Sequence, residues 1–356
     1  MSNKVKNFNK SGIMIVVKCM KHIMNIKREV LIDEFLNLGL KKFNASQVFD
    51  WLYLKHEYNV DNWSNISKDV QKIIKHNYDL SFIEIKKKQT DHLTSKYLFK
   101  LNDGNLIEAV LMNHDYGLSV CISSQVGCNM GCHFCESGRL KKVRNLETFE
   151  MVEQILLIEQ DINKRIDSVV IMCIGEPFDN YDNVMNFIRI INDPKGIAIG
   201  ARHITVSTCG LIPKIEKFME EDMQVNLAIS LHAPNNEIRS SIMEVNKVYS
   251  IDNLIDTIRK YIARTNRRVT LEYVMLYNIN DSLECANELA DLIQGMNVYV
   301  NLIPYNETSH LEFKKSPNIN AFYDQLKKRK INVTVRREFG GKIDAACGQL
   351  RSKEVD

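Results

Sequence analysis

The chain is 356 residues long, with 45% apolar and 26% charged residues, which is the composition of an ordinary globular protein of about two domains. This composition excludes collagen-like, intrinsically disordered and disulfide-scaffold proteins. The net charge is only +3, but residues 1–100 carry 18 Lys and Arg against 10 Asp and Glu. Such a basic N-terminal third favours a polyanionic partner such as nucleic acid. A lysine-rich solvated surface fits the charge equally well.

No stretch of the sequence reaches the roughly 18 apolar residues that a membrane-spanning helix needs. The apolar run Gly12–Val17 lies between lysines and lacks a small-residue cleavage site, so it is a poor secretion signal. We therefore expect a cytoplasmic protein with no membrane partner. Nine cysteines in a reducing compartment argue against a disulfide framework and favour metal or redox chemistry where they cluster.

In the N-terminal part of the chain, a helical periodicity of apolar residues begins near residue 29. Residues 1–28 show little periodicity and are expected to form an extension. Over residues 29–80 apolar side chains recur at helical spacing, which predicts a small helical accessory domain spanning residues 29–95. We expect Trp51 and Trp63 to lie in the core of this domain.

The rest of the chain, residues 96–352, predicts a β/α barrel preceded by a hairpin. The hairpin strands are Lys96–Leu101 and Leu106–Met112, joined by Asn102-Asp103-Gly104. Further predicted strands are Ser119–Ser123, Ser168–Cys173, His203–Ser207, Asn226–Leu231, Val269–Leu276, Val298–Ile303 and Val333–Arg336. The helices predicted between them are Thr148–Asp161, Asp182–Asn192, Pro213–Glu220, Ile251–Arg264, Ser282–Gln294 and Ile319–Lys330. Six or more β-then-α units predict a parallel sheet curled into a full or partial barrel, with its active site at the C-terminal strand ends.

Three cysteines follow the first barrel strand in the pattern C-x3-C-x2-C, as Cys128, Cys132 and Cys135. Three thiolates on a tight loop can bind one metal centre and leave a coordination position open for a substrate or cosubstrate. The alternative is a structural zinc site, which needs a fourth ligand. His133 is available but lies between two of the cysteines.

This cysteine spacing in a β/α chain resembles the radical S-adenosylmethionine (SAM) superfamily, in which a 4Fe–4S cluster leaves one iron open to SAM. Further motifs resemble the RlmN/Cfr family over about residues 29–352. They are CISSQVGCNMGCHFC (Cys121–Cys135), GEP (Gly175–Pro177), SLHAP (Ser230–Pro234), NLIPYN (Asn301–Asn306) and DAACGQL (Asp344–Leu350). The resemblance implies a partial (β/α)6 barrel behind a helical accessory domain. It also implies methylation of an adenine base in RNA, namely 23S rRNA and, for the RlmN branch, tRNA.

The resemblance also implies catalytic roles. Cys347 would accept a methyl group from one SAM, and a second SAM would supply the radical that activates it. Cys121 would then attack the sulfur of Cys347, releasing the product and leaving a transient disulfide. Glu108 matches the base that removes a ring proton. Without the family match, the residues alone favour a buried structural thiol at Cys347 and allow one at Cys121. Glu108 could equally lie on a solvent face.

The cosubstrate contacts implied by the family fall at or near predicted strand ends, which independently suits a pocket at the barrel mouth. They are Gly175, Glu176, Ser207, Ser230, Leu231, His232 and Asn306. A lone Gly-Glu-Pro turn is weak evidence by itself, and an isolated histidine is more often a core or rim residue. Basic residues after the cluster loop, such as Lys142 and Arg144, could bind RNA phosphates, as could Lys86–Lys88.

The chain departs from the family pattern at three places, one of which is the missing glycine in the loop Arg139–Leu146. It has Cys173-Ile174 where Gly-Met is usual before Gly-Glu-Pro, and Glu136-Ser137 where Ala or Ser and then Thr usually follow the third cluster cysteine. We predict methylation at adenine C2 by a monomer that takes electrons from a flavodoxin or ferredoxin. The alternatives are C8 methylation of the Cfr type, a radical SAM enzyme with another substrate, and a zinc-stabilised RNA-binding module.

Overall fold

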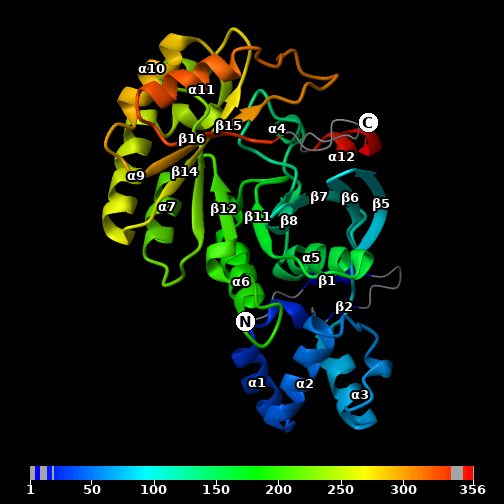
Figure 1. Cartoon of the computed structure of the whole chain (residues 1–356). Coiled ribbons are helices and arrows are strands. Elements are labelled where there is room, and N and C mark those ends of the chain that lie inside the picture. The colour runs from blue at the N-terminus through cyan, green and yellow to red at the C-terminus, as the bar shows by residue number, and fades with distance from the viewer. Residues whose placement is uncertain (1–4, 9–13, 18–19, 338–347, 356) are drawn as a thin grey trace. The chain divides into compact units, whose positions relative to one another are not determined.

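The computed structural model describes residues 5–8, 14–17, 20–337 and 348–355 (Figure 1). The chain divides into two compact units. The first comprises residues 1–82 and 189–198, and the second comprises residues 83–188 and 199–356. None of the helices in the described ranges is long and apolar enough to cross a membrane.

The first unit is a small helical domain. Its elements are β1 (Val5–Phe8), β2 (Met14–Val17), β3 (Lys21–His22), η1 (Ile23–Asn25), α1 (Arg28–Asn37), α2 (Lys42–Tyr53), η2 (Val60–Asn62), α3 (Lys68–Asn77) and β4 (Tyr78–Asp79). Phe35 and Val48, at the helical spacing seen in the sequence, are buried with Trp63. Trp51 lies partly exposed, with its indole donating to Asn65 at 2.6 Å and the Lys55 ammonium 3.5 Å from its ring centre. The core prediction is therefore confirmed for Trp63 and wrong for Trp51.

The limits of this unit differ from the predicted domain limits at both ends. His22, Ile23 and Met24 are buried, so residues assigned to the extension already belong to the folded domain. The unit ends at Phe82, not at residue 95, because β5 (Glu84–Asp91) pairs with β6 (Thr94–Lys100) in the second unit. The charged, exposed sequence of β5 lacks the apolar alternation that identifies a strand, as is common at a sheet edge.

The second unit is built on one ten-stranded sheet in the order β16-β15-β14-β13-β12-β11-β8-β7-β6-β5. The strands after β6 are β7 (Leu106–His114), β8 (Gly117–Ile122), β11 (Ser168–Ile171), β12 (Ile204–Thr208), β13 (Asn226–Ser230), β14 (Val269–Met275), β15 (Val298–Pro304) and β16 (Val333–Val335). Strands β8 and β11–β16 are parallel, whereas β5–β8 form an antiparallel meander. Strands β16 and β5 are the two edges of this sheet and do not pair with each other. The sheet is therefore an open, partial barrel, as predicted.

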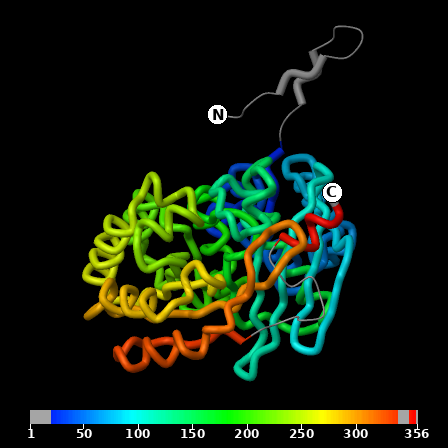
Figure 2. Tube along the Cα trace, turned by 90° about the horizontal axis from the view of Figure 1, so that it is seen from above, coloured from blue at the N-terminus to red at the C-terminus, as the bar shows by residue number. Residues whose placement is uncertain are grey.

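Helices connect the parallel strands and cover one face of the sheet (Figures 1 and 2). They are α5 (Thr148–Ile162), α6 (Tyr181–Asn192), α7 (Ile212–Met219), α9 (Ile251–Thr265), α10 (Leu283–Leu292) and α11 (Ile319–Lys328). Helix α9 shows why the sequence predicts them. Ser250 caps its first turn, Leu254 and Ile258 bury one face, and Asn266 ends it in the left-handed region.

Shorter elements that the sequence did not predict surround the strand ends. They are β9 (Gln125–Val126), α4 (Glu136–Arg139), β10 (Arg144–Asn145), η3 (Pro177–Asn180), η4 (Ala201–His203), α8 (Asn236–Ile242), η5 (Glu244–Lys247) and α12 (Gln349–Val355). Helix α12, red in Figure 2, lies beside the cyan strands β5–β7 and contacts β7 and α4. The C-terminal end of the chain therefore packs onto the meander that precedes the barrel.

Candidate active site

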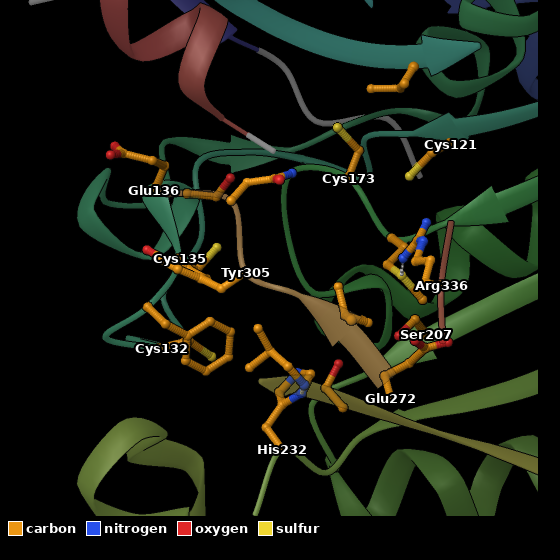
Figure 3. Close-up of a pocket in the computed structure, with 18 of the residues that line it drawn as sticks. Cys121, Cys132, Cys135, Glu136, Cys173, Ser207, His232, Glu272, Tyr305 and Arg336 are labelled. Carbon is orange, nitrogen blue, oxygen red and sulfur yellow. Dashed lines mark hydrogen bonds between the residues drawn. The ribbon is translucent and has the colours of Figure 1, made fainter. Parts of the chain in front are cut away.

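A cavity of about 320 Å³ opens where the parallel strands end, inside the second unit. Its wall takes side chains from the strands β6, β7, β8, β12, β13, β14 and β15 and from α4 (Figure 3). The segments that follow β9, β11, β12, β13, β15 and β16 complete it. This is the end of the barrel at which the sequence predicted a site.

The three motif cysteines, Cys128, Cys132 and Cys135, line this cavity. Burial raises the pKa of Cys128 to about 12 and that of Cys132 well above its usual range, and the neighbouring thiols add to both effects. The loop is held by its backbone: a Cβ on Gly127 would lie 2.2 Å from the carbonyl oxygen of Lys141, and the amide of Cys128 donates to Leu140 at 3.1 Å. Small, left-handed Gly127 thus lets the loop fold back on itself.

His133 does not join these cysteines. Its Nδ1 lies 2.9 Å from the carbonyl oxygen of Ser241, and its Nε2 lies 3.2 Å from Glu244. Among the residues that the structure describes, no three His, Cys, Asp or Glu side chains are grouped to hold a single metal ion. Three cysteine thiols on the cavity wall, with the ring of Phe134 beside them, fit a 4Fe–4S cluster that takes one cysteine on each of three irons.

The Gly175–Glu176 turn lines the same cavity, and the Glu176 carboxylate is close enough to Cys128 and Cys132 to raise the pKa of both thiols. Gly175 has φ +106°, and a Cβ there would lie 2.6 Å from the Cβ of Gln125. The carboxylate of Glu176 accepts from the amides of Phe178 at 3.0 Å and Cys209 at 2.8 Å. Burial raises the pKa of Glu176 despite these bonds. The side chains of Thr208 and Cys209 also hydrogen-bond to this carboxylate, which is therefore held firmly at the cavity wall.

The remaining predicted cosubstrate residues divide into two groups. Ser207, Ser230, His232 and Asn306 line the cavity together with Gly175 and Glu176. Leu231 is fully buried behind the wall, so its side chain is not brought to the site. His232 accepts from the amide of Val274 at 3.0 Å through Nδ1, and burial lowers its pKa to about 3. It is therefore a neutral ring whose proton is on Nε2.

Of the predicted catalytic residues, Cys121 lies on the cavity wall and is otherwise buried. Cys173 lines the same region and shares an apolar cluster with it (Figure 3). Cys347 lies outside the described residues, but its neighbour Gly348 is described. Glu108 is fully buried and does not form part of the cavity wall. Instead its carboxylate accepts from the amides of Gly348 at 2.8 Å and Arg351 at 2.5 Å.

Sequence reasoning missed several polar residues of this site. Lys96 on β6 is buried, lines the cavity and lies 3.0 Å from Glu108. Glu272 on β14 lines the cavity, accepts from Asn301 at 2.8 Å, and has its pKa raised by burial. An acid within the apolar strand Val269–Met275 is the same signal that pointed to Glu108, so Glu272 could have been found. Lys96 carries no comparable signal in its strand.

Most of the basic residues expected to bind RNA phosphates are paired within the protein. Arg144 binds Asp103 and Glu150, and Lys142 lies 2.7 Å from Asp179. Lys86 and Lys87 pair with Glu354, and Lys88 pairs with Asp161. Their charges are therefore partly compensated in the folded protein.

Comparison with known proteins connects this site to a family. Residues 122–293 match the model of the radical SAM superfamily, and residues 21–79 match that of the ribosomal RNA large subunit methyltransferase N-terminal domain. A probable dual-specificity RNA methyltransferase RlmN of Spiroplasma citri is 52% identical, over 94% of this chain and 98% of its own. The chain belongs to the RlmN family of radical SAM RNA methyltransferases. An RlmN of Listeria welshimeri is 54% identical, over 89% of each chain.

A solved structure supports the same assignment. The crystal structure of a radical SAM methyltransferase from Sphaerobacter thermophilus has a TM-score of 0.88 and 39% identity, covering 92% of this chain and 98% of that one. This RlmN-family chain is therefore a radical SAM enzyme, and its cofactors are a 4Fe–4S cluster and SAM. The predicted family, fold class and cofactors are confirmed.

Proposed function

We propose that this enzyme methylates C2 of an adenine in 23S rRNA, and also in tRNA, through a methyl group carried on Cys347. One observation carries the proposal. A single cavity gathers the cluster cysteines, Cys121 and the cosubstrate residues other than Leu231. Gly348, the residue after Cys347, is bonded to Glu108, whose ion-pair partner Lys96 lines the cavity. The relatives from Spiroplasma citri and Enterococcus faecalis, each 52% identical, are named dual-specificity RNA methyltransferases.

The target explains why this set of side chains is needed. An aromatic ring carbon that bears hydrogen is not nucleophilic enough to attack a methyl sulfonium directly. When bound, the cluster and SAM supply the electron, the methyl group and the radical. The chain itself provides Cys128, Cys132 and Cys135 to hold the cluster. Gly175, Glu176, Ser207, Ser230, His232 and Asn306 bind SAM. Leu231 supports this wall from behind, since its amide donates to the carbonyl of Glu272 and its carbonyl accepts from Arg239.

The two remaining thiols complete the transfer. Cys347 is the nucleophile that accepts the methyl group and presents it to the base. The thiolate of Cys121 then attacks the sulfur of Cys347, so that a disulfide forms and the bond between that sulfur and the transferred carbon breaks. The electron pair stays on this carbon, which takes up a proton and becomes the methyl group of the product. A cellular dithiol reductant restores both thiols. Glu108, beside Gly348, accepts the ring proton once its hydrogen bonds to the C-terminal segment rearrange.

The test is nucleoside mass spectrometry of total RNA from a host that lacks its own adenine C2 and C8 methyltransferases. Expression of the intact enzyme should produce 2-methyladenosine, and Cys347→Ala should produce none. Appearance of 8-methyladenosine would mean that the enzyme methylates adenine by this chemistry, but at C8 and not at C2. A soluble, iron-loaded enzyme that gives neither product would overturn the proposal and favour another substrate.

We propose further that the enzyme works as a monomer in the cytoplasm and takes electrons from a flavodoxin or ferredoxin. Residues 96–352 would carry the reaction, and the helical domain before them would contribute to RNA binding. The excess of Lys and Arg in residues 1–100 supports a role of the helical domain in RNA binding. Size-exclusion chromatography with light scattering, and reduction of the enzyme by purified flavodoxin, test the oligomeric state and the donor.

A further inference from the structure

Glu136 is a buried carboxylate at the junction of the cluster loop and the C-terminal helix. It directly follows Cys135, its side chain is only 1% exposed, and it lines the cavity (Figure 3). A buried carboxylate is costly unless it is hydrogen-bonded and paired with a cation. Its partners therefore show what the carboxylate does at this position.

These partners come from three segments of the chain. Oε2 accepts from the hydroxyl of Ser352 on α12 at 3.2 Å and lies 3.4 Å from Nε of Arg139 on α4. Nη2 of Arg139 also donates to the Ser352 hydroxyl at 2.9 Å. Oε1 lies 3.4 Å from Nδ1 of His310, in the loop after β15. One side chain thus links the cluster loop, the β15 loop and the C-terminal helix.

The backbone packs closely at the same junction. Gly348 has φ +84°, and a Cβ there would lie 2.7 Å from Oγ of Ser137 and 3.3 Å from Cβ of Glu136. From the other side, Glu108 accepts from the amides of Gly348 and Arg351. Two buried carboxylates from different elements therefore hold the chain directly after Cys347.

Cys135 and Cys347 are each one residue away from this junction, since Cys135 precedes Glu136 and Cys347 precedes Gly348. Buried polar networks add little net stability, but they can fix one geometry among several. A radical transfer depends on such geometry, because misplacing the reacting atoms by about 1 Å can cost about 100-fold in rate.

We propose that Glu136 is a positioning residue that holds Gly348 and α12, the residues directly after Cys347, against the cluster loop. This inference rests on the proposed role of Cys347 as methyl carrier. Glu136 contacts Ser352 and Arg139 but holds neither the cluster nor the substrate. Replacing Glu136 should leave cluster assembly intact. More 5′-deoxyadenosine should then form for each adenosine that is methylated.

The experiment compares Glu136→Ala and Glu136→Gln with Glu244→Ala. Glu244 is a carboxylate 42% exposed to solvent that lies beside Gly131 of the same cluster loop and pairs with His133 and Lys247, so it is a matched control. Hydrogen exchange of the Ser352 amide, which bonds to the carbonyl of Gly348, reports how firmly α12 is held. The number of 5′-deoxyadenosine molecules formed per methylated adenosine reports whether the radical reaches its target.

In Glu136→Ala we expect unchanged iron content, about tenfold faster exchange at Ser352, and a rise of about tenfold in 5′-deoxyadenosine per product. Glu136→Gln keeps an acceptor oxygen of the same size and should stay within about twofold of the intact enzyme on both readouts. A general loss of folding would lower both products together and leave their ratio unchanged.

The inference is overturned if Glu136→Ala matches Glu244→Ala in both exchange and product ratio, or if Glu136→Gln is as impaired as Glu136→Ala. Failure of the proposed function is a separate result, in which the intact enzyme forms no methyladenosine. The exchange measurement then still decides whether Glu136 holds α12.

Discussion

The two sides of the cavity are held in place by different means. On the cluster side, backbone hydrogen bonds and glycines set the loop: Gly127 allows a close turn, and the amide of Cys128 bonds to Leu140. On the C-terminal side, the buried side chains of Glu108 and Glu136 bind the backbone and a hydroxyl of α12. The cluster side is thus set by close backbone packing around Gly127 and Cys128, which suits the binding of a 4Fe–4S cluster. The C-terminal side is a polar junction of buried carboxylates that holds Gly348 and α12.

The largest effect is expected from a substitution that disturbs the close backbone packing of the cluster loop. Gly127→Ala places a Cβ 2.2 Å from a backbone oxygen, at φ +78°. Since neither the left-handed conformation nor the backbone clash can be relieved by a side-chain rotation, the cysteine loop should not close. We expect iron content and methylation to fall by about 100-fold or more, as measured by iron assay and nucleoside mass spectrometry.

Gly104→Ala is the matched control for this change. Gly104 has φ +85° in the hairpin turn between β6 and β7, and a Cβ there would meet nothing within 4 Å. It should cost only about 1–2 kcal/mol of conformational strain and leave the iron content intact. Equal iron loading in the two variants would show that Gly127 does not shape the cluster loop.

The next effect comes from removing the cation on the C-terminal side. Lys96→Met leaves the fully buried carboxylate of Glu108 with amide donors but without its ammonium partner at 3.0 Å. Breaking a buried pair in this way costs about 3–5 kcal/mol. We expect that loss in the free energy of unfolding, measured by circular dichroism in denaturant, together with unchanged iron content before unfolding.

Lys88→Met provides the comparison on the neighbouring strand. Lys88 pairs with Asp161 at 2.6 Å, but both side chains are about one-third exposed. Solvent screening limits such a pair to about 1 kcal/mol or less. If Lys96→Met proved no more costly than Lys88→Met, the C-terminal side would not depend on its buried charges.

The contrast between the two sides also explains what the sequence could predict. The parallel strands and their helices repeat an apolar pattern, and the cluster cysteines follow a local spacing, so both could be predicted from short stretches of sequence. Glu136 and Lys96 derive their roles from partners far away in the chain, such as Ser352 and Glu108. No local pattern encodes such pairs, and the exposed edge strand β5 likewise lacks the apolar alternation of a buried strand.

The smallest effect concerns His232, whose ring packs edge-on against Phe134 of the cluster loop. Burial lowers its pKa from 6.5 to about 3, so the folded ring stays neutral where the unfolded one becomes protonated. The unfolded state therefore binds more protons below pH 6.5, and the free energy of unfolding should fall by about 2 kcal/mol between pH 7 and pH 5 from this residue alone. His232→Gln should remove that part of the decline, whereas His203→Gln, at an exposed histidine, should keep it. Parallel pH profiles in the three proteins would mean that His232 takes up a proton in the folded enzyme. The folded enzyme would then hold a buried charge at His232, as the C-terminal side does at Glu108 and Glu136.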